Sequence, residues 1–326
     1  MSDLKTPWFW RGLPSALLSP AALLYRTAQE LRFARARRQA HAIPLVIVGN
    51  PRVGGSGKTP VSIDLVERLR GSGQRCAWIG RGVGGDGRLR RVGPTDDARA
   101  VGDEACMAQR QLVDACYAGV PRSELITMAA ADGCDVAVSD DGMQSPDLRA
   151  DVLVVVLRAE DPWGNGRRLP AGPLREGPEC LKRADLIVWH GLDQGAIALP
   201  EDADGRWVRA WYEVEPPDLT DAKPLSVCTA IADPDRLVRG LSGHGLAFNE
   251  QVYRRDHGAL PLAKLDRKST WITTEKDLAR HAHELPDDLD LRATKLVLHW
   301  DDGGARVDAM LSRLMQANVD TGRGAQ

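Results

Sequence analysis

The stretch Gly49-Asn-Pro-Arg-Val-Gly-Gly-Ser-Gly-Lys-Thr59 joins an apolar run at residues 44–50 to a helical pattern at residues 59–70. A glycine-rich turn between a strand and a helix, ending in Lys-Thr, is typical of a phosphate-binding loop (P-loop). Its glycines let the backbone approach a phosphate, and the N-terminus of the following helix supplies N–H groups. The strict pattern has a glycine where this chain has Arg52, so the stretch is a variant P-loop.

The end of this loop predicts nucleotide chemistry. Lys58 is expected to reach the β- and γ-phosphates, and the Thr59 hydroxyl is expected to bind Mg²⁺. The nucleotide-binding residues that the pattern predicts are Gly54, Gly55, Ser56, Gly57, Lys58 and Thr59. The sequence therefore indicates a site for a nucleotide together with magnesium.

A pair of carboxylates, Asp140-Asp141, follows an apolar run at residues 136–139. P-loop enzymes place a Mg²⁺-coordinating aspartate at the end of such a strand, and ligands bind at the carboxyl ends of parallel strands. The alternative is an ordinary polar strand end with a turn at Gly142. Because a P-loop lies upstream, we favour Thr59, Asp140 and Asp141 as metal ligands, with Asp141 also beside the nucleotide.

Short apolar runs alternate with helical patterns after residue 40. The strand-like runs lie at residues 44–50, 75–80, 135–139, 151–157 and 185–189, and in a second set at residues 225–230, 245–254, 269–274 and 295–300. Such runs predict an α/β fold, a P-loop NTPase-like core with a parallel sheet covered on both faces. A helix is expected at residues 104–118. The acidic, proline-bearing stretch 200–219 is the best boundary candidate, which predicts a core domain at 41–205 and a smaller α/β domain at 206–326.

Residues 1–40 are predicted to form a separate helical arm. They contain seven Lys or Arg and two acidic residues, a net charge of +5. Their aromatic side chains are Trp8, Phe9, Trp10, Tyr25 and Phe33. This composition is typical of a segment that lies in a membrane interface. A helix packed on the protein body, with a solvated arginine face, fits the composition equally well.

The composition of the whole chain excludes several classes of protein. Its 326 residues carry 43 Lys or Arg and 45 Asp or Glu, and a net charge of −2 argues against a general nucleic-acid coat. No uncharged run approaches the roughly 20 residues of a membrane-spanning helix, and no secretory signal peptide is indicated. None of the six cysteines forms a C-x-x-C motif, which favours a reducing cytosolic compartment.

Further candidate residues lie outside these motifs. Asp103, at a predicted helix start, is either a general base for an acceptor hydroxyl or only an acid that suits the helix dipole, and its spacing alone favours the second. His257 follows Asp256, a pairing that is common by chance. Loops rich in glycine and arginine at residues 81–85 and 164–176 either hold anions or only connect elements.

Taken together, these segments resemble the tetraacyldisaccharide 4′-kinases of lipid A biosynthesis. The resemblance runs from residue 8 to about residue 277. It rests on the aromatic arm, Gly49-Asn50, Gly54-Gly-Ser-Gly-Lys-Thr59, Arg81-Gly-x-Gly-Gly85, Gly102-Asp-Glu104, Asp140-Asp-Gly-x-Gln144, Gly164-Asn-Gly166, Leu169-Pro-Ala-Gly-Pro-Leu-Arg-Glu176, Asp256-His257 and Thr273-Thr-Glu-Lys-Asp277. No single segment is decisive, whereas their number and order are highly specific.

The resemblance implies an ATP-dependent kinase that uses Mg²⁺ at the cytoplasmic face of the inner membrane of a Gram-negative cell. The implied reaction phosphorylates the 4′-hydroxyl of an acylated glucosamine disaccharide 1-phosphate. Asp103, assisted by His257, would be the base, and Lys58 would be the third catalytic residue. The candidate substrate contacts are Asn50, Arg81, Asn165 and Arg175. The implied partners are the glycolipid and the membrane surface, with no nucleic acid and a monomer favoured.

The chain departs from the family pattern at a few positions, and two other functions stay open. Ser145 stands where the family usually has His, Gly258 where a second His often follows Asp-His, and Ala230-Ile-Ala232 replaces Gly-Ile-Gly. The main alternative is a P-loop switch or assembly ATPase acting at the membrane surface, although such proteins have a signature Lys where this chain has Val53. A non-catalytic membrane-surface binding protein is disfavoured because Lys58 and the paired aspartates are retained.

Overall fold

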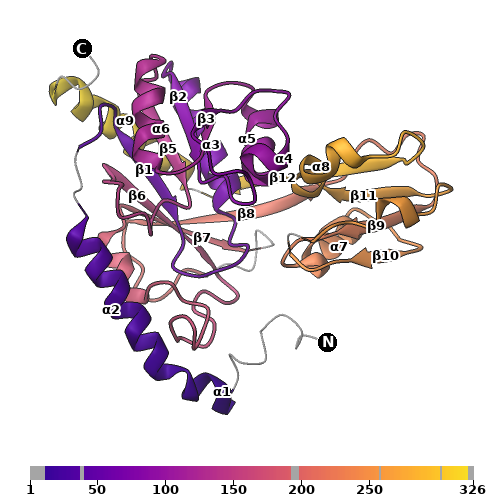
Figure 1. Ribbon diagram of the computed structural model, residues 1–326, viewed down its shortest axis with the longest axis horizontal. Coiled ribbons are helices and arrows are strands. Elements are labelled where there is room, and N and C mark those ends of the chain that lie inside the picture. Colours follow the sequence, from indigo (N-terminus) through magenta and orange to yellow (C-terminus); the bar gives the residue numbers. More distant parts are fainter. Residues whose placement is uncertain (1–11, 37–39, 192–197, 257, 302, 322–326) are drawn as a thin grey trace.

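The computed structural model describes residues 12–36, 40–191, 198–256, 258–301 and 303–321 (Figure 1). The helices are α1 (Gly12–Leu17), α2 (Ser19–Arg35), α3 (Lys58–Gly71), α4 (Ala98–Val101), α5 (Asp103–Leu112), α6 (Arg122–Ala131), α7 (Pro234–Gly243), α8 (Glu275–His281) and α9 (Gly304–Thr321). The strands are β1 (Leu45–Gly49), β2 (Cys76–Gly80), β3 (Arg90–Arg91), β4 (Cys116–Ala118), β5 (Val136–Asp140), β6 (Val152–Arg158), β7 (Leu186–Gly191), β8 (Trp207–Glu215), β9 (Leu225–Thr229), β10 (Gln251–Tyr253), β11 (Thr270–Thr274) and β12 (Leu291–Trp300). Short 3₁₀ helices lie at Pro178–Arg183, Leu262–Lys264 and Ala282–Glu284.

Within the described residues the strands form one sheet, in the order β10-β9-β11-β12-β8-β7-β6-β1-β5-β2-β4-β3. In the series β8-β7-β6-β1-β5-β2-β4 each strand is parallel to its neighbours. The strands in the series β10-β9-β11-β12 are also parallel to one another. The two parts meet where β8 and β12 pair antiparallel. Figure 1 shows these two strands running from the core toward β9, β10, β11, α7 and α8, which we call the second lobe. The fold is thus mixed α/β with a sheet that is mostly parallel.

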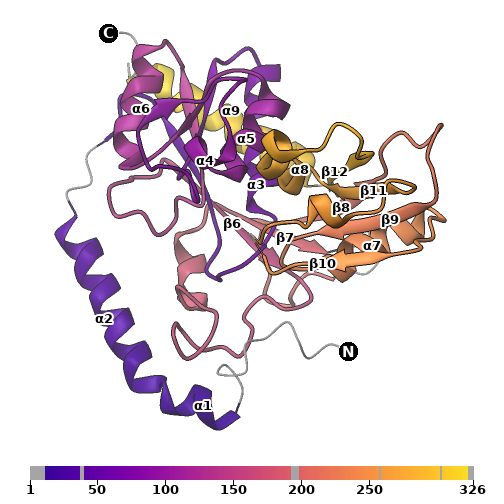
Figure 2. The same ribbon diagram turned by 45° about the vertical axis from the view of Figure 1, so that its right-hand side comes forward.

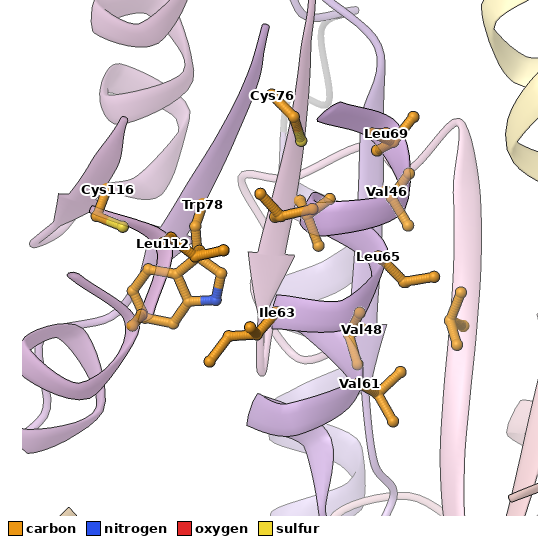
Figure 3. Close-up of a cluster of buried hydrophobic side chains, with 14 of the residues drawn as sticks. Val46, Val48, Val61, Ile63, Leu65, Leu69, Cys76, Trp78, Leu112 and Cys116 are labelled. Atoms are coloured by element: carbon orange, nitrogen blue, oxygen red, sulfur yellow. The ribbon is translucent and has the colours of Figure 1, made fainter. Parts of the chain in front are cut away.

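Hydrophobic layers cover both faces of the core sheet. Val46 and Val48 of β1 belong to a cluster with side chains of α3, α5 and α9, whereas Leu45 and Ile47 belong to a cluster with α6. This alternation is that of a strand whose successive side chains point to opposite faces. Figure 3 shows α3 packed along β1 and β2, with Leu65 among the buried residues. This packing holds the start of α3, and with it the P-loop, at the carboxyl end of β1.

The stretch at residues 200–219, which the sequence indicated as a boundary, contains the central strand β8. Along β8 the side chains alternate between buried and less buried positions, as expected for a strand. Prolines on both sides of it are typical of a linker, which made the strand difficult to recognise from the sequence. The last helix, α9, returns to the core, where Val307, Leu311 and Leu314 are buried. A division between residues 205 and 206 stays a prediction.

The helix predicted at residues 104–118 is wrong in its second part, since α5 ends at Leu112 and strand β4 follows. Val113 and Ala115 have positive φ angles of 64° and 49°. A helix cannot continue through residues in this left-handed region, so the chain reverses there. The strand predicted at residues 245–254 is also shorter, because only its last part forms β10.

The described part of the N-terminal arm is helical, and Figure 2 shows α2 lying outside the layers of the core. No residue of α2 is buried. Leu17, at the end of α1, is 72% exposed. Leu24 and Leu31 of α2 are 73% and 46% exposed, and their spacing of seven places them on one side of that helix. Among the described residues, none of the helices combines the length and the apolarity that crossing a membrane requires. Trp8, Phe9 and Trp10 lie outside the described residues, and membrane binding by the arm stays a prediction.

Candidate active site

The P-loop surrounds the N-terminus of α3, as the sequence predicts. Lys58 is the first residue of α3, and Gly57 before it has a φ of 75°, a left-handed value that glycine adopts without strain. Lys58 Nζ lies 3.2 Å from Ser56 Oγ and 3.6 Å from Asp141 Oδ1. The loop thus combines a side-chain cation with the free N–H groups of a helix N-terminus, an arrangement suited to phosphate.

Asp140 is the last residue of β5, which pairs with β1, so its carboxylate lies beside the P-loop. Thr59 Oγ1 donates a 2.6 Å hydrogen bond to Asp140 Oδ2, whereas Asp140 Oδ1 is buried and has no hydrogen-bond partner among the described residues. Burial, reinforced by the charge of Glu104, raises the pKa of Asp140 to about 7. A buried carboxylate with a spare oxygen favours a bound cation.

The oxygen atoms at this position fit Mg²⁺. The carboxylate of Asp140 and the hydroxyl of Thr59 are hard ligands of the kind that this ion prefers. In the described part of the chain, no group of three or more His, Cys, Asp or Glu is placed to hold a metal ion. Protein Mg²⁺ sites usually combine one or two carboxylates with phosphate oxygens and water, so a larger cluster is not required.

Asp141 is fixed between two cations. Its carboxylate oxygens each lie 2.9 Å from Arg175 Nη1, which also donates to Gln144 Oε1 at 3.1 Å. Burial alone would raise the pKa of Asp141, but the positive charges of Lys58 and Arg175 outweigh it, and the pKa lies below its ordinary value. Asp141 is therefore a stable anion that orients the lysine of the P-loop, and its predicted contact with the metal stays a prediction.

Arg122 belongs to this site although no sequence signal identified it. Its buried guanidinium donates from Nη1 to the Asp140 carbonyl oxygen at 2.6 Å and from Nη2 to the Asp141 carbonyl oxygen at 2.9 Å. These bonds hold the turn that carries both carboxylates. No sequence motif indicates this role for Arg122, because its partners are backbone atoms of residues that are distant in the chain.

The loop at residues 164–176 lies against the P-loop. The backbone N–H of Arg175 donates to the Pro51 carbonyl oxygen at 2.6 Å, and the N–H of Val53 donates to the Pro173 carbonyl oxygen at 2.9 Å. These bonds place the Arg175 side chain at Asp141. The predicted arginine-bearing loop is therefore part of the same site as the P-loop.

Asp103, at the start of α5, contacts the second lobe. It is 4% exposed, it forms an ion pair with Arg280, and its carboxylate lies 3.8 Å from Lys276 Nζ. Both cations belong to α8, which is anchored by Asp277 through a 2.6 Å hydrogen bond from Thr229 Oγ1 at the end of β9. The Thr-Thr-Glu-Lys-Asp segment thus presents α8 to the carboxylate predicted to act as the base.

The remaining predicted residues do not all gather at this point. Asn50 Nδ2 donates to a carbonyl oxygen in β6 at 2.6 Å, and Asn165 Nδ2 donates to one in its own loop at 3.0 Å, so both amides support the backbone. Arg81 is exposed at the end of β2. His257 lies outside the described residues. Substrate contacts by Asn50, Arg81 and Asn165 therefore stay predictions.

Two of the departures from the family pattern lie near the site. A Cβ added at Gly55 of the P-loop would lie 3.6 Å from the Ala232 Cβ, an ordinary van der Waals contact. Ser145 belongs to the turn after the paired aspartates, where its N–H donates to the Gly142 carbonyl oxygen at 2.9 Å. The segment before α7 thus lies beside the P-loop.

Removal of the Asp140 charge is expected to stabilise the Mg²⁺-free protein at alkaline pH. Because the pKa of Asp140 is about 7 in the folded protein against an ordinary value of 3.8, the folded state holds the proton more tightly, and stability falls as the pH rises from about 4 to about 7. Asp140→Asn should raise the free energy of unfolding at pH 8 by on the order of 3 kcal/mol, and the gain should shrink toward pH 5. Urea unfolding in EDTA at both pH values measures this, and a less stable variant at pH 8 would contradict it.

Known protein families and curated relatives match most of the chain. A family model described as tetraacyldisaccharide-1-P 4′-kinase matches residues 14–316. Among curated proteins named tetraacyldisaccharide 4′-kinase, one from Rhodospirillum centenum is 33% identical over 344 residues, covering 98% of this chain and 99% of that protein. Another, from Hyphomonas neptunium, is 31% identical over 340 residues, covering 96% of this chain and 98% of that protein.

A solved structure has a similar fold. It is described as the "apo" form of LpxK from Aquifex aeolicus in complex with ATP. The TM-score is 0.77 at 22% sequence identity, over 92% of this chain and 99% of the other. At this identity the likeness concerns the fold, which extends through the core and the second lobe.

Proposed function

This chain belongs to the tetraacyldisaccharide-1-P 4′-kinase family, and from that premise we propose that it transfers the γ-phosphate of ATP to the 4′-hydroxyl of tetraacyldisaccharide 1-phosphate. The observation that carries the proposal is that Lys58 contacts Asp141 while Thr59 contacts Asp140. One edge of the sheet thus offers a phosphate loop, a hydroxyl and two carboxylates. In the transfer, the bond from the γ-phosphorus to the β–γ bridging oxygen breaks, and a bond to the 4′-oxygen forms.

The residues of the P-loop would bind and orient ATP. Lys58 and the N–H groups at the start of α3 would neutralise charge on the β- and γ-phosphates, while Arg175 adds a second cation close to Asp141. Thr59 and Asp140 would hold Mg²⁺, which neutralises negative charge on the phosphates when bound. Phosphate transfer depends mainly on such positioning and charge stabilisation, which this arrangement supplies.

Asp103 is our candidate for the base that accepts the proton of the 4′-hydroxyl. Its ion pair with Arg280 and its contact with Lys276 hold the carboxylate in place at the start of α5. The acceptor hydroxyl would have to compete with these two cations for the carboxylate oxygens. Assistance by His257 remains part of the proposal from the family resemblance.

The acceptor is a lipid, and we propose that the arm lies on the cytoplasmic side of the inner membrane. The exposed leucines of the arm would enter the interface while its arginines face lipid head groups. Ser15 Oγ donates to the Ala171 carbonyl oxygen at 2.6 Å and accepts a 3.1 Å hydrogen bond from Asn165. The arm is thereby joined to the loop that carries Arg175, which supports approach of the head group from that side.

Replacing Leu17, Leu24 and Leu31 together by serine is expected to weaken membrane binding. The substitutions remove exposed apolar surface that a bilayer interface would bury, so partition onto anionic vesicles should fall at least about tenfold. Sedimentation with vesicles that contain phosphatidylglycerol measures the change. Kinase activity in detergent micelles should change much less than the partition.

A matched control removes the same number of apolar side chains elsewhere. Val113, Val120 and Val319 are 74%, 49% and 72% exposed and lie outside the arm. Serine at these three positions should leave vesicle binding within about twofold of the wild type, since none of them would reach the interface. Equal losses in the two triple variants would refute the arm as the membrane-binding surface.

The function is tested by incubating the protein with γ-³²P-ATP, Mg²⁺ and purified tetraacyldisaccharide 1-phosphate in detergent micelles. A labelled lipid that is formed only with all three components is the expected result. Mass spectrometry should locate the new phosphate at the 4′ position. ATP hydrolysis without any labelled lipid would favour the switch ATPase instead, and failure to bind ATP would favour a non-catalytic membrane-binding protein.

A further inference from the structure

The inner side of the P-loop rests on two aromatic side chains from β7 and β8. His190 Nε2 lies 2.8 Å from the Ser56 carbonyl oxygen, and the Tyr212 hydroxyl donates a 2.6 Å hydrogen bond to the Gly57 carbonyl oxygen. The two rings contact each other edge to face, with centroids 4.8 Å apart. Two consecutive carbonyl groups of the loop are therefore held by side chains that belong to none of the motifs described above.

Holding these carbonyls determines where the amides of the same peptides point. In a planar trans peptide the C=O and N–H bonds point in opposite directions. Because the carbonyls of Ser56 and Gly57 point toward His190 and Tyr212, the N–H groups of Gly57 and Lys58 point away from them. Those are N–H groups of the kind that cradle a phosphate at a helix N-terminus.

The fit at Gly57 shows how closely Tyr212 is packed. A Cβ added at this glycine would overlap the hydroxyl and the ring of Tyr212, which is 2% exposed. The glycine is therefore needed for the contact with the tyrosine as well as for its left-handed φ. Any side chain at position 57 would therefore force Tyr212 or the loop to move.

His190 is suited to act as a constant donor. It is fully buried, and burial together with the charge of Arg236 lowers its pKa to about 3. The ring is therefore neutral at physiological pH, and Nε2, which faces a carbonyl oxygen, carries the proton. The hydrogen bond to the P-loop is thus present throughout the pH range in which the enzyme would work.

Arg236 of α7 braces this pair from the second lobe. Its guanidinium lies over the Tyr212 ring, 5.3 Å from the centroid, within the range of a cation–π contact. Arg158 at the end of β6 forms a 3.3 Å ion pair with Asp233, the N-cap residue of the same helix. The start of α7 is therefore fixed behind the P-loop, and Tyr212 has little room to move.

We propose that His190 and Tyr212 are positioning residues for ATP, which hold the P-loop peptides in the conformation that presents their N–H groups to the phosphates. The proposal rests on the proposed function only in taking ATP as the ligand of this loop. The pair touches the loop from behind and does not touch the reacting atoms. Its loss should therefore weaken nucleotide binding more than binding of the lipid.

The variant Tyr212→Phe tests the proposal, since it removes only the hydroxyl. It is expected to raise the Kd for MgADP about fivefold to tenfold, which corresponds to the loss of one buried hydrogen bond. Calorimetric titration with MgADP measures this without catalysis. In steady-state kinetics the KM for ATP should rise similarly, while the KM for the lipid stays within about twofold of the wild-type value.

Tyr117→Phe is the matched control. Tyr117 is also fully buried, and its hydroxyl donates a hydrogen bond of the same length, 2.6 Å, to Asp132 away from the P-loop. This variant should lose similar stability but bind MgADP as the wild type does. His190→Gln, whose amide can still donate to the Ser56 carbonyl, should bind MgADP more tightly than His190→Phe.

Two results would overturn the proposal: wild-type affinity for MgADP in a folded Tyr212→Phe protein, or an equal loss of affinity in Tyr117→Phe. Thermal unfolding of each variant verifies that the titrated protein is folded. If the wild type bound MgADP but failed to phosphorylate the lipid, the function would be wrong while the positioning role could still be measured. The two failures are therefore distinguishable.

Discussion

Replacement of Lys58 by alanine is expected to lower kcat for phosphate transfer about 10³-fold. The ammonium group lies between Ser56 and Asp141 at the N-terminus of α3, where the β- and γ-phosphates would bind. Loss of one well-placed group that stabilises transition-state charge typically costs this much. Single-turnover transfer of ³²P to the lipid at saturating ATP measures the change in the chemical step.

The matched control is Lys264→Ala, because Lys264 is an exposed lysine of the second lobe. Its activity should stay within about twofold of the wild type, since an isolated surface charge contributes little. Lys58→Arg should recover only part of the activity, because a planar guanidinium does not replace a compact ammonium at a phosphate. Normal turnover by a folded Lys58→Ala protein would refute the assignment of the P-loop.

Asp103→Asn is expected to lower kcat between about 10²-fold and 10⁴-fold, the range for loss of a general base. The substitution keeps the shape of the side chain and removes its ability to accept the proton of the acceptor hydroxyl. It also removes one buried anion beside Arg280 and Lys276, which keep their contacts with Asp277 and Glu104, so a lower free energy of unfolding is expected as well. Activity should therefore be measured at a temperature where thermal unfolding shows a folded variant.

The neighbouring carboxylate provides the control for this experiment. Glu104 is the next residue of α5 and lies 3.7 Å from the same Lys276 Nζ, but its side chain is 37% exposed. Glu104→Gln changes the local charge equally and should lower kcat by less than about tenfold, since a partly exposed ion pair is weak. Similar losses in the two variants would indicate an electrostatic effect of the acidic cluster rather than a base at Asp103.

Much of the fold was predictable because each element has a local pattern. The P-loop, its flanking strand and helix, and the two aspartates at the carboxyl end of β5 depend on residues that are contiguous in the chain. Strand β8 was missed because its alternating pattern lies between prolines and acidic residues typical of a linker. The helix predicted at residues 104–118 was too long, since the left-handed turn at Val113 and Ala115 has no glycine to indicate it.

The candidate site was predictable only where its residues belong to local sequence motifs. Lys58, Thr59, Asp140 and Asp141 could be assigned to one place, because the carboxyl ends of neighbouring parallel strands meet at one edge of the sheet. Arg122 and Tyr212 could not be found in this way. Each contacts backbone carbonyls of the site through long-range packing, and such contacts require no particular neighbours in the sequence.

The phosphate loop, the α/β class and the resemblance to one family follow from local spacing and from the order of short motifs, so they can be inferred without coordinates. The pairing of distant charges, Arg175 with Asp141 and Arg280 with Asp103, becomes visible only in the folded chain. The same is true of the way in which β8 and β12 join the second lobe to the core in one sheet. An ion pair or a strand pairing between distant segments depends on the packing of the whole chain. The sequence around one partner contains no pattern that identifies the other.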